Sequence, residues 1–336
     1  MLICRLVSVS STELSTNVFK DTNVLLLNRM NPCCVIFNIS TKELKNYVND
    51  DFFFPNAVNS FTKWNPNVKL LVITNENLKT YVEEGYTWTS IGILRVHVIN
   101  YLLSHNLYSK VIMLGADTIT CGKLDEFLDC NDCDLICSLG PYHWEYKTVF
   151  WAAPKIQYEY NERRYEDNTF INADVTCFNT AKAAKLVHDI SIEQFSSGHH
   201  EQGGLNYCFL NQGQLDLKVK IVDFPYALSN VIYNVRSKGI AAGGGQMRRG
   251  KLYYGFDGPE ISTVYPTAEY SVKDDKLFTS DGKQIKVFHY AENICFKSDS
   301  DGSLPKDEQI REMKTMWFNK ETVLFLNNHC NCSGFT

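Results

Sequence analysis

The stretch Lys110-Val-Ile-Met-Leu-Gly-Ala-Asp-Thr118 decides the fold of this chain. Its four consecutive apolar residues, Val111 to Leu114, are typical of a strand that is buried on both faces of a sheet. The strand ends in a small residue, a carboxylate and a hydroxyl. Because ligands of open α/β sheets bind beyond the carboxyl ends of the strands, Asp117 stands where chemistry is expected. For Asp117 alone, an aspartate that starts a turn or caps a helix is the alternative.

The composition is that of a globular protein. The chain has 336 residues, 44% of them hydrophobic and 21% charged, which suffices for one large domain or two small ones. Its net charge of −5 argues against general nucleic-acid binding, which usually needs a basic excess. No run approaches the ~20 apolar residues of a membrane span. We therefore expect neither a nucleic-acid partner nor a membrane span.

The cysteines point to a reducing compartment. The chain has 12 cysteines, and its N-terminus lacks the pattern of a signal peptide. Free thiols without such a signal predict a cytoplasmic protein. Cys130-Asn-Asp-Cys133 is either half of a zinc site or a pair of plain thiols, and no second such pair follows it.

Apolar runs alternate with amphipathic stretches as far as about residue 225. The periodicity predicts strands at 33–39, 68–74, 110–114, 134–139 and 170–178, and helices at 42–48, 89–105, 124–128, 180–190 and 200–211. This order of strands and helices favours an α/β fold with a mostly parallel sheet flanked by helices.

The remaining segments surround this core. Residues 1–32 form an N-terminal extension that precedes the first clear strand and has no assignment. Residues 235–283 combine a glycine-rich loop with a hairpin, which predicts a small antiparallel insertion near the C-terminal third. The main domain is expected at 33–300, and a C-terminal helix and tail at 301–336.

Five short motifs carry polar groups suited to phosphate and sugar chemistry. They are Leu94-Arg-Val-His97, Gly115-Ala-Asp-Thr118, Phe170-Ile-Asn-Ala-Asp-Val175, Glu201-Gln-Gly-Gly-Leu-Asn206 and Val287-Phe-His-Tyr290. In order and spacing they resemble the retaining family 8 glycosyltransferases, which include glycogenin and bacterial lipooligosaccharide galactosyltransferases. The resemblance covers the chain from 33 to 300. It implies a Rossmann-like fold of the GT-A type, a nucleotide-sugar donor (usually a UDP-sugar) and a divalent ion, Mn²⁺ or Mg²⁺.

The resemblance implies a metal site at Asp117 and His289. Family members end this strand in Asp-x-Asp and hold the ion with both carboxylates, whereas this chain has Gly115 at the first position. A divalent ion stabilises the charge of the departing nucleoside diphosphate, and oxygen and imidazole ligands suit Mn²⁺ or Mg²⁺. With one carboxylate missing, we expect weak metal binding in the absence of donor. For His289 alone, a strand histidine in an ordinary hydrogen bond is the alternative.

The resemblance also implies a donor site. Asn38 and Ser40, which follow the first strand, would contact the nucleoside, and Arg95 would clamp the diphosphate. Lys297 would neutralise the β-phosphate, but it stands two residues beyond the family position, so a solvated lysine is the alternative. Asn172 and Ala173 match a turn that touches the donor sugar.

Three residues are assigned to catalysis. Asp174 replaces a glycine of the family, and it either brings a carboxylate to the reacting centre or caps a turn. Glu201 stands where the family has aspartate and would hydrogen-bond sugar hydroxyls, with Gln202 beneath the anomeric carbon. Negative charge there favours an oxocarbenium-like transition state. The alternative for Glu201 is a first-turn acid that the helix dipole stabilises.

These features predict a retaining hexosyltransferase that uses a UDP-sugar and a divalent metal. Its acceptor would be a glycan, a protein or a lipid-linked sugar, bordered by the aromatic segment 140–168 and by 239–283. The alternative is a degenerate GT-A protein that binds nucleotide-sugar or glycan without turnover, because a carboxylate is missing at Gly115. A sugar nucleotidyltransferase is disfavoured, because residues 38–48 lack the glycine-rich loop that it needs after the first strand.

Overall fold

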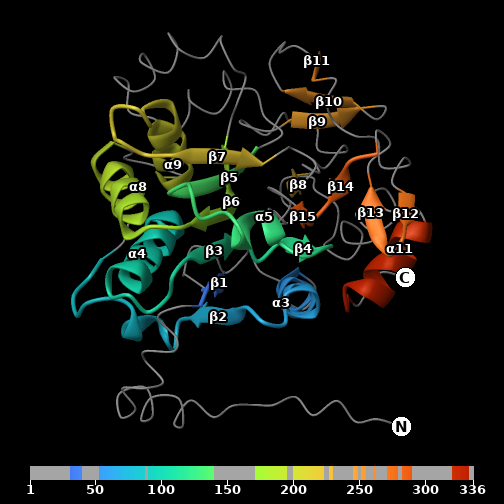
Figure 1. The fold of residues 1–336 in the computed structure, drawn as a ribbon, viewed down its shortest axis with the longest axis horizontal. Coiled ribbons are helices and arrows are strands. Elements are labelled where there is room, and N and C mark those ends of the chain that lie inside the picture. Colours follow the sequence, from blue (N-terminus) through green and yellow to red (C-terminus); the bar gives the residue numbers. More distant parts are fainter. Residues whose placement is uncertain are drawn as a thin grey trace, which may run out of the picture.

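A computed structural model describes twelve parts of the chain (Figure 1). They are residues 31–39, 53–87, 90–139, 171–194, 200–222, 227–229, 245–248, 251–254, 260–261, 271–278, 282–289 and 320–332. Several expectations therefore lie outside the described residues, among them the helix at 42–48, the aromatic segment 140–168, and the donor-site roles of Ser40 and Lys297.

A six-stranded sheet with the order β2-β1-β3-β6-β5-β7 forms the centre of the described structure. Its strands are β1 (Cys33–Asn38), β2 (Lys69–Thr74), β3 (Val111–Leu114), β5 (Leu135–Leu139), β6 (Ile171–Phe178) and β7 (Val219–Val222). Every strand except β6 runs in one direction, because β6 is antiparallel to both β3 and β5 while the other pairs are parallel. The predicted α/β fold with a mostly parallel sheet is confirmed.

Two separate hydrophobic cores cover the two faces of this sheet. Alternate residues of each strand enter alternate cores, so that Val35 of β1 faces the first core and Ile36 the second. The first core is shared with α4 (Ile91–Ser104), α8 (Ala181–Gln194) and α9 (His200–Leu210), and the second with α3 (Phe53–Trp64) and α5 (Asp125–Leu128). Because both faces are buried, the central strands read as continuous apolar runs in the sequence.

Most of the expected helices and strands that fall in the described residues are confirmed within a few residues. The sequence did not indicate α3, whose first turn contains Pro55, or the short strands β4 (Thr118–Thr120) and β7. The described residues also contain a 3-10 turn at Leu78–Thr80 and the helix α11 at Lys320–His329. None of the helices in the described ranges has the length and apolar character that crossing a bilayer requires.

Three small sheets flank the main one. The first has the order β4-β15-β8 and contains β15 (Val287–His289) and β8 (Ala227–Ser229). The second joins β9 (Gly245–Arg248), β10 (Lys251–Tyr254) and β11 (Glu260–Ile261), and the third joins β12 (Ser271–Lys273), β13 (Lys276–Phe278) and β14 (Gln284–Ile285). The pairs within the second and third sheets are antiparallel, as expected for this part of the chain.

Strand β6 changes face in its middle. Before residue 174, Ile171 and Ala173 enter the first core, whereas Val175 enters the second although it has the same parity. The pairing with β5 shifts at the same place, since Cys137 is opposite Thr176 while the next residue is opposite Asn172. A bulge of this kind re-aims a side chain. Asp174 stands at the point of the change.

A buried lysine anchors the start of β3. Nζ of Lys110 donates to the carbonyl oxygens of Leu128 at 2.7 Å, Cys130 at 2.9 Å and Phe127 at 3.3 Å, and to Oδ1 of Asn131 at 3.1 Å. Oxygens of the last two residues of α5 and of the segment that follows it thus satisfy a cation that would be costly to bury alone. Lys110 immediately precedes β3 and thereby fixes the start of that strand, whose other end leads to the candidate site.

Replacing Lys110 with methionine should lower the free energy of unfolding by about 2 kcal/mol or more, because buried oxygens lose a charged donor. Urea denaturation measures the change. The matched control is Lys182→Met, which removes an exposed lysine paired with Asp216 and should cost less than about 1 kcal/mol. Equal losses in the two variants would contradict the anchoring role of Lys110.

Candidate functional site

Asp117 lies in the turn between β3 and β4. The Oγ1 of Thr118 donates to the carbonyl of Gly115 at 2.8 Å, and its backbone N donates to the same oxygen at 3.3 Å. These bonds close a four-residue turn with Asp117 at its third position. Asp117 is only 7% exposed, so its carboxylate is held at the carboxyl edge of the sheet.

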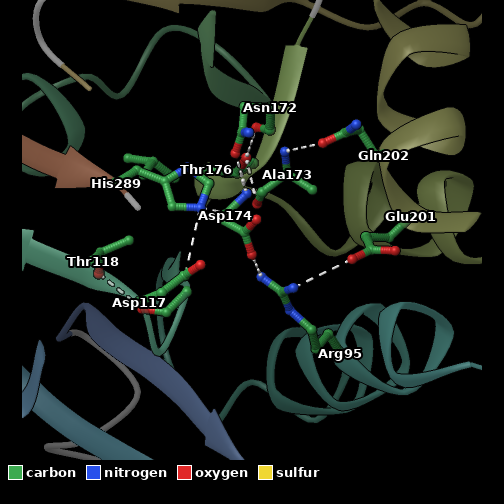
Figure 2. Close-up of polar contacts among 12 residues, drawn as sticks. Arg95, Asp117, Thr118, Asn172, Ala173, Asp174, Thr176, Glu201, Gln202 and His289 are labelled. Carbon is green, nitrogen blue, oxygen red and sulfur yellow. Dashed lines mark hydrogen bonds and ion pairs between the residues drawn. The ribbon is translucent and has the colours of Figure 1, made fainter. Parts of the chain in front are cut away.

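Strand pairing brings His289 to the same place. Strand β15 runs antiparallel to β4 and aligns His289 with Thr118. The Nε2 of His289 lies 3.5 Å from Oδ1 of Asp117 and 3.3 Å from Oδ2 of Asp174 (Figure 2). Burial lowers the pKa of His289, but the charge of Asp117 and the contacts with both carboxylates outweigh it and raise the pKa to about 10. The carboxylates thus concentrate negative charge around a buried ring.

Asp174 joins this group to Arg95. Its Oδ1 accepts a hydrogen bond from Nη2 of Arg95 at 2.6 Å, while its Oδ2 faces His289. Burial raises the pKa of the Asp174 carboxyl, but the charge of Arg95 and the hydrogen bond from His289 hold it well below its usual range. The carboxylate of Asp174 is thus directed toward Arg95 and His289 (Figure 2).

Arg95 in turn bridges Asp174 to Glu201. Its Nη1 donates to Oε1 of Glu201 at 3.3 Å. Burial lowers the pKa of Arg95, but the charges of Asp174 and Glu201 outweigh it, so the guanidinium stays charged. The second oxygen of Glu201, Oε2, is buried and accepts no hydrogen bond from the described residues. A buried oxygen of this kind is costly unless a ligand donates to it.

A glycine makes room for Glu201. A Cβ at Gly92 would lie 1.6 Å from Oε2 of Glu201, so any larger residue at position 92 would collide with the carboxylate. A glycine inside a helix costs about 1 kcal/mol relative to alanine, and close packing is a reason to retain it. The sequence reasoning missed Gly92, although an isolated glycine in an apolar helix was the available signal.

Two amide side chains fix α9 to β6. The Oε1 of Gln202 accepts from the backbone N of Ala173 at 3.2 Å. One turn later, Oδ1 of Asn206 accepts from the backbone N of Ile171 at 2.8 Å, and its Nδ2 donates back to the Ile171 carbonyl at 3.0 Å. These bonds set the position of Glu201, which precedes Gln202. Asn206 had no predicted role, although its spacing of four from Gln202 puts both on one helix face.

Asn172 and Ala173 lie at the bulge of β6 beside Asp174. The Oδ1 of Asn172 accepts from the backbone N of Asp174 at 2.8 Å, and both Asn172 and Ala173 are buried. The amide of Asn172 therefore supports the bent backbone that carries Asp174.

Not every predicted residue joins the site. Asn38 ends β1, whose register places Ile36 beside Leu114, so Asn38 reaches the same edge of the sheet, but none of the described contacts links it to the other site residues. His97 of the Arg95 motif is directed elsewhere, since its Nδ1 lies 3.3 Å from Nε2 of His188 and its ring stacks on Tyr86.

Three side chains form a group that could hold a metal ion. Asp117, Asp174 and His289 each offer one ligand atom, and these atoms lie within 4.8 Å of one another. Two carboxylates and an imidazole are the donors that Mn²⁺ and Mg²⁺ accept. Gly115 leaves space beside them, because a Cβ there would lie 2.6 Å from Oδ1 of Asp117. The donor set and the space both fit a divalent ion.

A second group combines Cys130, Asp132 and Cys133. Burial, followed by the hydrogen bond and charge of Cys130, raises the pKa of Cys133 to about 12. Structural zinc takes four ligands and this group offers three, so half of a zinc site and a pair of plain thiols both stay open as interpretations. The cysteines of the described residues are all free thiols.

Comparisons with known proteins gave similar structures only. No family model matches the chain, and no curated protein matches it. One similar structure is the apo form of WbbM, a bifunctional glycosyltransferase, with 13% identity over 59% of this chain and 40% of that chain and a TM-score of 0.41. Another is the apo-form glycosyltransferase GlyE of Streptococcus pneumoniae TIGR4, with 14% identity over 59% of this chain and 47% of that chain and a TM-score of 0.35.

A third similar structure is a glycosyltransferase involved in glycosylation of the major capsid of PBCV-1. It has 13% identity over 60% of this chain and 85% of that chain, with a TM-score of 0.36. The matched region thus spans less than half of WbbM and of GlyE. At TM-scores below 0.5 these are similarities and no more.

Replacing Gly92 with alanine should lower the free energy of unfolding by about 1–3 kcal/mol, because the new Cβ displaces Glu201. Adding Glu201→Asp, which withdraws the carboxylate by one methylene, should recover at least about 0.5 kcal/mol in a double-mutant cycle. Urea denaturation of the three variants measures this coupling.

The control is Gly213→Ala, where a Cβ meets nothing within 4 Å. It should change stability by no more than about 0.5 kcal/mol. If Gly92→Ala instead stabilised the protein by the ~1 kcal/mol that helix propensity alone supplies, the packing of Gly92 against Glu201 would be refuted.

Proposed function

We propose that this protein is a retaining glycosyltransferase of the GT-A type, which transfers a hexose from a UDP-sugar to an acceptor hydroxyl with the help of Mn²⁺ or Mg²⁺. The observation that carries the proposal is the continuous, largely buried row of charged side chains that runs from Asp117 and His289 through Asp174 and Arg95 to Glu201 (Figure 2). It offers a cation site, a guanidinium and a free carboxylate oxygen in that order.

The diphosphate of the donor would lie between the metal ligands and Arg95. A divalent ion held by Asp117 and His289 supplies charge stabilisation to the phosphates as the bond between sugar and phosphate oxygen breaks. Arg95 has five N–H donors, and its contacts with Asp174 and Glu201 leave others for phosphate oxygens. Because both partners are anionic, the guanidinium is held charged and in a fixed orientation before the donor arrives.

The donor sugar would lie against Glu201 and Gln202. Glu201 is buried with its Oε1 held by Arg95, and its carboxylate is proposed to accept a hydrogen bond from a sugar hydroxyl. Gln202 is held in place by the backbone N of Ala173 and would lie beneath the anomeric carbon. The carboxylate of Glu201 places negative charge near a carbon that becomes positive in the transition state.

The rest of the donor and the acceptor would extend beyond this row. Asn38 and Ser40 are proposed to contact the nucleoside, Lys297 the β-phosphate, and Asn172 and Ala173 the sugar, as the family resemblance implies. The acceptor class stays open among a glycan, a protein side chain and a lipid-linked sugar.

Incubation with UDP-glucose, UDP-galactose or UDP-N-acetylglucosamine should release UDP in a reaction that depends on Mn²⁺. Asp117→Asn and His289→Asn should each lower the rate by about 10²-fold or more, because they remove several kcal/mol of charge stabilisation. Asp216→Asn is the control, since Asp216 is an exposed surface carboxylate paired with Lys182. No turnover with any donor, together with no thermal stabilisation by UDP, would sink the proposal.

A degenerate protein that binds nucleotide-sugar without turnover is the second candidate, because Gly115 lacks the carboxylate that the resembling family has there. The same assay separates the two candidates. A degenerate protein would be stabilised thermally by UDP and Mn²⁺ but would release no UDP from any of the three donors.

A further inference from the structure

Gly115 and Asp174 occupy facing positions on neighbouring strands. The antiparallel register of β3 and β6 places Leu114 opposite Val175, and the backbone N of Gly115 donates to the carbonyl of Asp174 at 2.8 Å. A Cβ at Gly115 would lie 3.0 Å from Cβ of Asp174 and 3.1 Å from its Oδ1. The two positions therefore share one volume, which has room for a single carboxylate.

The chain fills that volume from the opposite strand to the one that the sequence motif suggests. At the end of β3, where the Asp-x-Asp pattern would put its first carboxylate, there is Gly115, and at the bulge of β6, where that pattern comes with a glycine, there is Asp174. Relative to that pattern, aspartate at 174 alone would collide with a carboxylate at 115, and glycine at 115 alone would leave a gap. The two departures together move the side chain from one facing position to the other.

We propose that Asp174 supplies the second carboxylate of the divalent-ion site, so that the carboxylate absent at Gly115 has been moved across to β6. The inference rests on the metal-dependent part of the proposed function. It makes Asp117, Asp174 and His289 a complete set of three protein ligands, whose ligand atoms lie within 4.8 Å of one another. Six-coordinate ions would then have positions left for phosphate oxygens and water.

The two oxygens of Asp174 already point in different directions. Oδ1 is taken by Arg95 at 2.6 Å, whereas Oδ2 lies 3.3 Å from Nε2 of His289. Because Asp174 contacts both groups, it couples the cation site to the guanidinium that is proposed to bind the diphosphate, which gives the exchange a consequence for donor binding.

The test is an exchange of side chains, with Mn²⁺ binding to the purified chain measured by electron paramagnetic resonance of the free ion, in the absence of donor. Loss of a group that merely supports a metal ligand costs about 10–100-fold in affinity, so Asp174→Gly and the nearly isosteric Asp174→Asn should each weaken binding by at least about tenfold. The double variant Gly115→Asp/Asp174→Gly should bind Mn²⁺ tightly again. Gly115→Asp alone should lower the melting temperature, because two carboxylates then compete for one volume.

Asp216→Gly is the matched control for the aspartate-to-glycine change. Asp216 is exposed and has a φ of 50°, a conformation that glycine adopts freely, so its replacement should leave Mn²⁺ affinity unchanged. The inference is overturned if wild-type protein binds no Mn²⁺, if Asp174→Asn binds it as tightly as wild type, or if the double variant binds no better than Asp174→Gly.

Failure of the proposed function would look different. Mn²⁺ affinity that is lost in Asp174→Asn and regained in the double variant, without release of UDP from any donor, would establish the exchanged ligand while refuting the transferase. Should Asp174→Gly fail to fold, Asp174→Asn keeps the shape of the side chain and decides the question by itself.

Discussion

The ion pair between Asp174 and Arg95 is the interaction on which the rest of the site depends. It connects Asp117 and His289, the group suited to a metal, to Glu201, the group suited to a sugar. Negative and positive side chains alternate along this largely buried row. Burying such charges is expensive, and removing one partner of a buried pair typically costs about 3–5 kcal/mol, because the other is left uncompensated. Replacing the whole row with hydrophobic side chains would cost less free energy of folding. The presence of the charged row is therefore better explained by ligand binding than by stability.

Backbone geometry and two glycines make this row possible. The bulge in β6 turns Asp174 out of the regular alternation of the strand, while Gly92 and Gly115 leave space for Glu201 and for the carboxylates of the ion site. Farther away, Lys110 holds the start of β3 through backbone oxygens at and just beyond the end of α5. The site is thus set by a rigid sheet edge and not by its own loop alone, which is what precise placement of reacting groups requires.

The sequence predicted the framework because buried parallel strands and amphipathic helices have strong periodic signals. β1 and β3 read as apolar runs, and α4 has apolar residues at helical spacing. Weaker signals were lost where elements are short: β4 has only three residues, and only its pairing with β15 shows how His289 reaches Asp117. The resemblance to the glycosyltransferase family predicted one site for both residues, but it did not predict which strands bring them together.

Asp174 shows why the rest of the site could not be predicted. In the sequence, Gly115 is a missing carboxylate and Asp174 an unexpected one, and nothing in the spacing of the two motifs says that they face each other. The bulge is equally hidden, because Ile171 to Phe178 reads as one continuous strand. Only the register of β3 against β6 shows that the two departures are a single change.

A crystal structure of the protein with Mn²⁺ and UDP, with data collected at the manganese absorption edge, tests the central claim most directly. The account predicts one anomalous peak ligated by Asp117, Asp174 and His289, with the diphosphate between this ion and Arg95. A peak that lacks Asp174 as a ligand, or UDP bound with no manganese between Asp117 and His289, would contradict it.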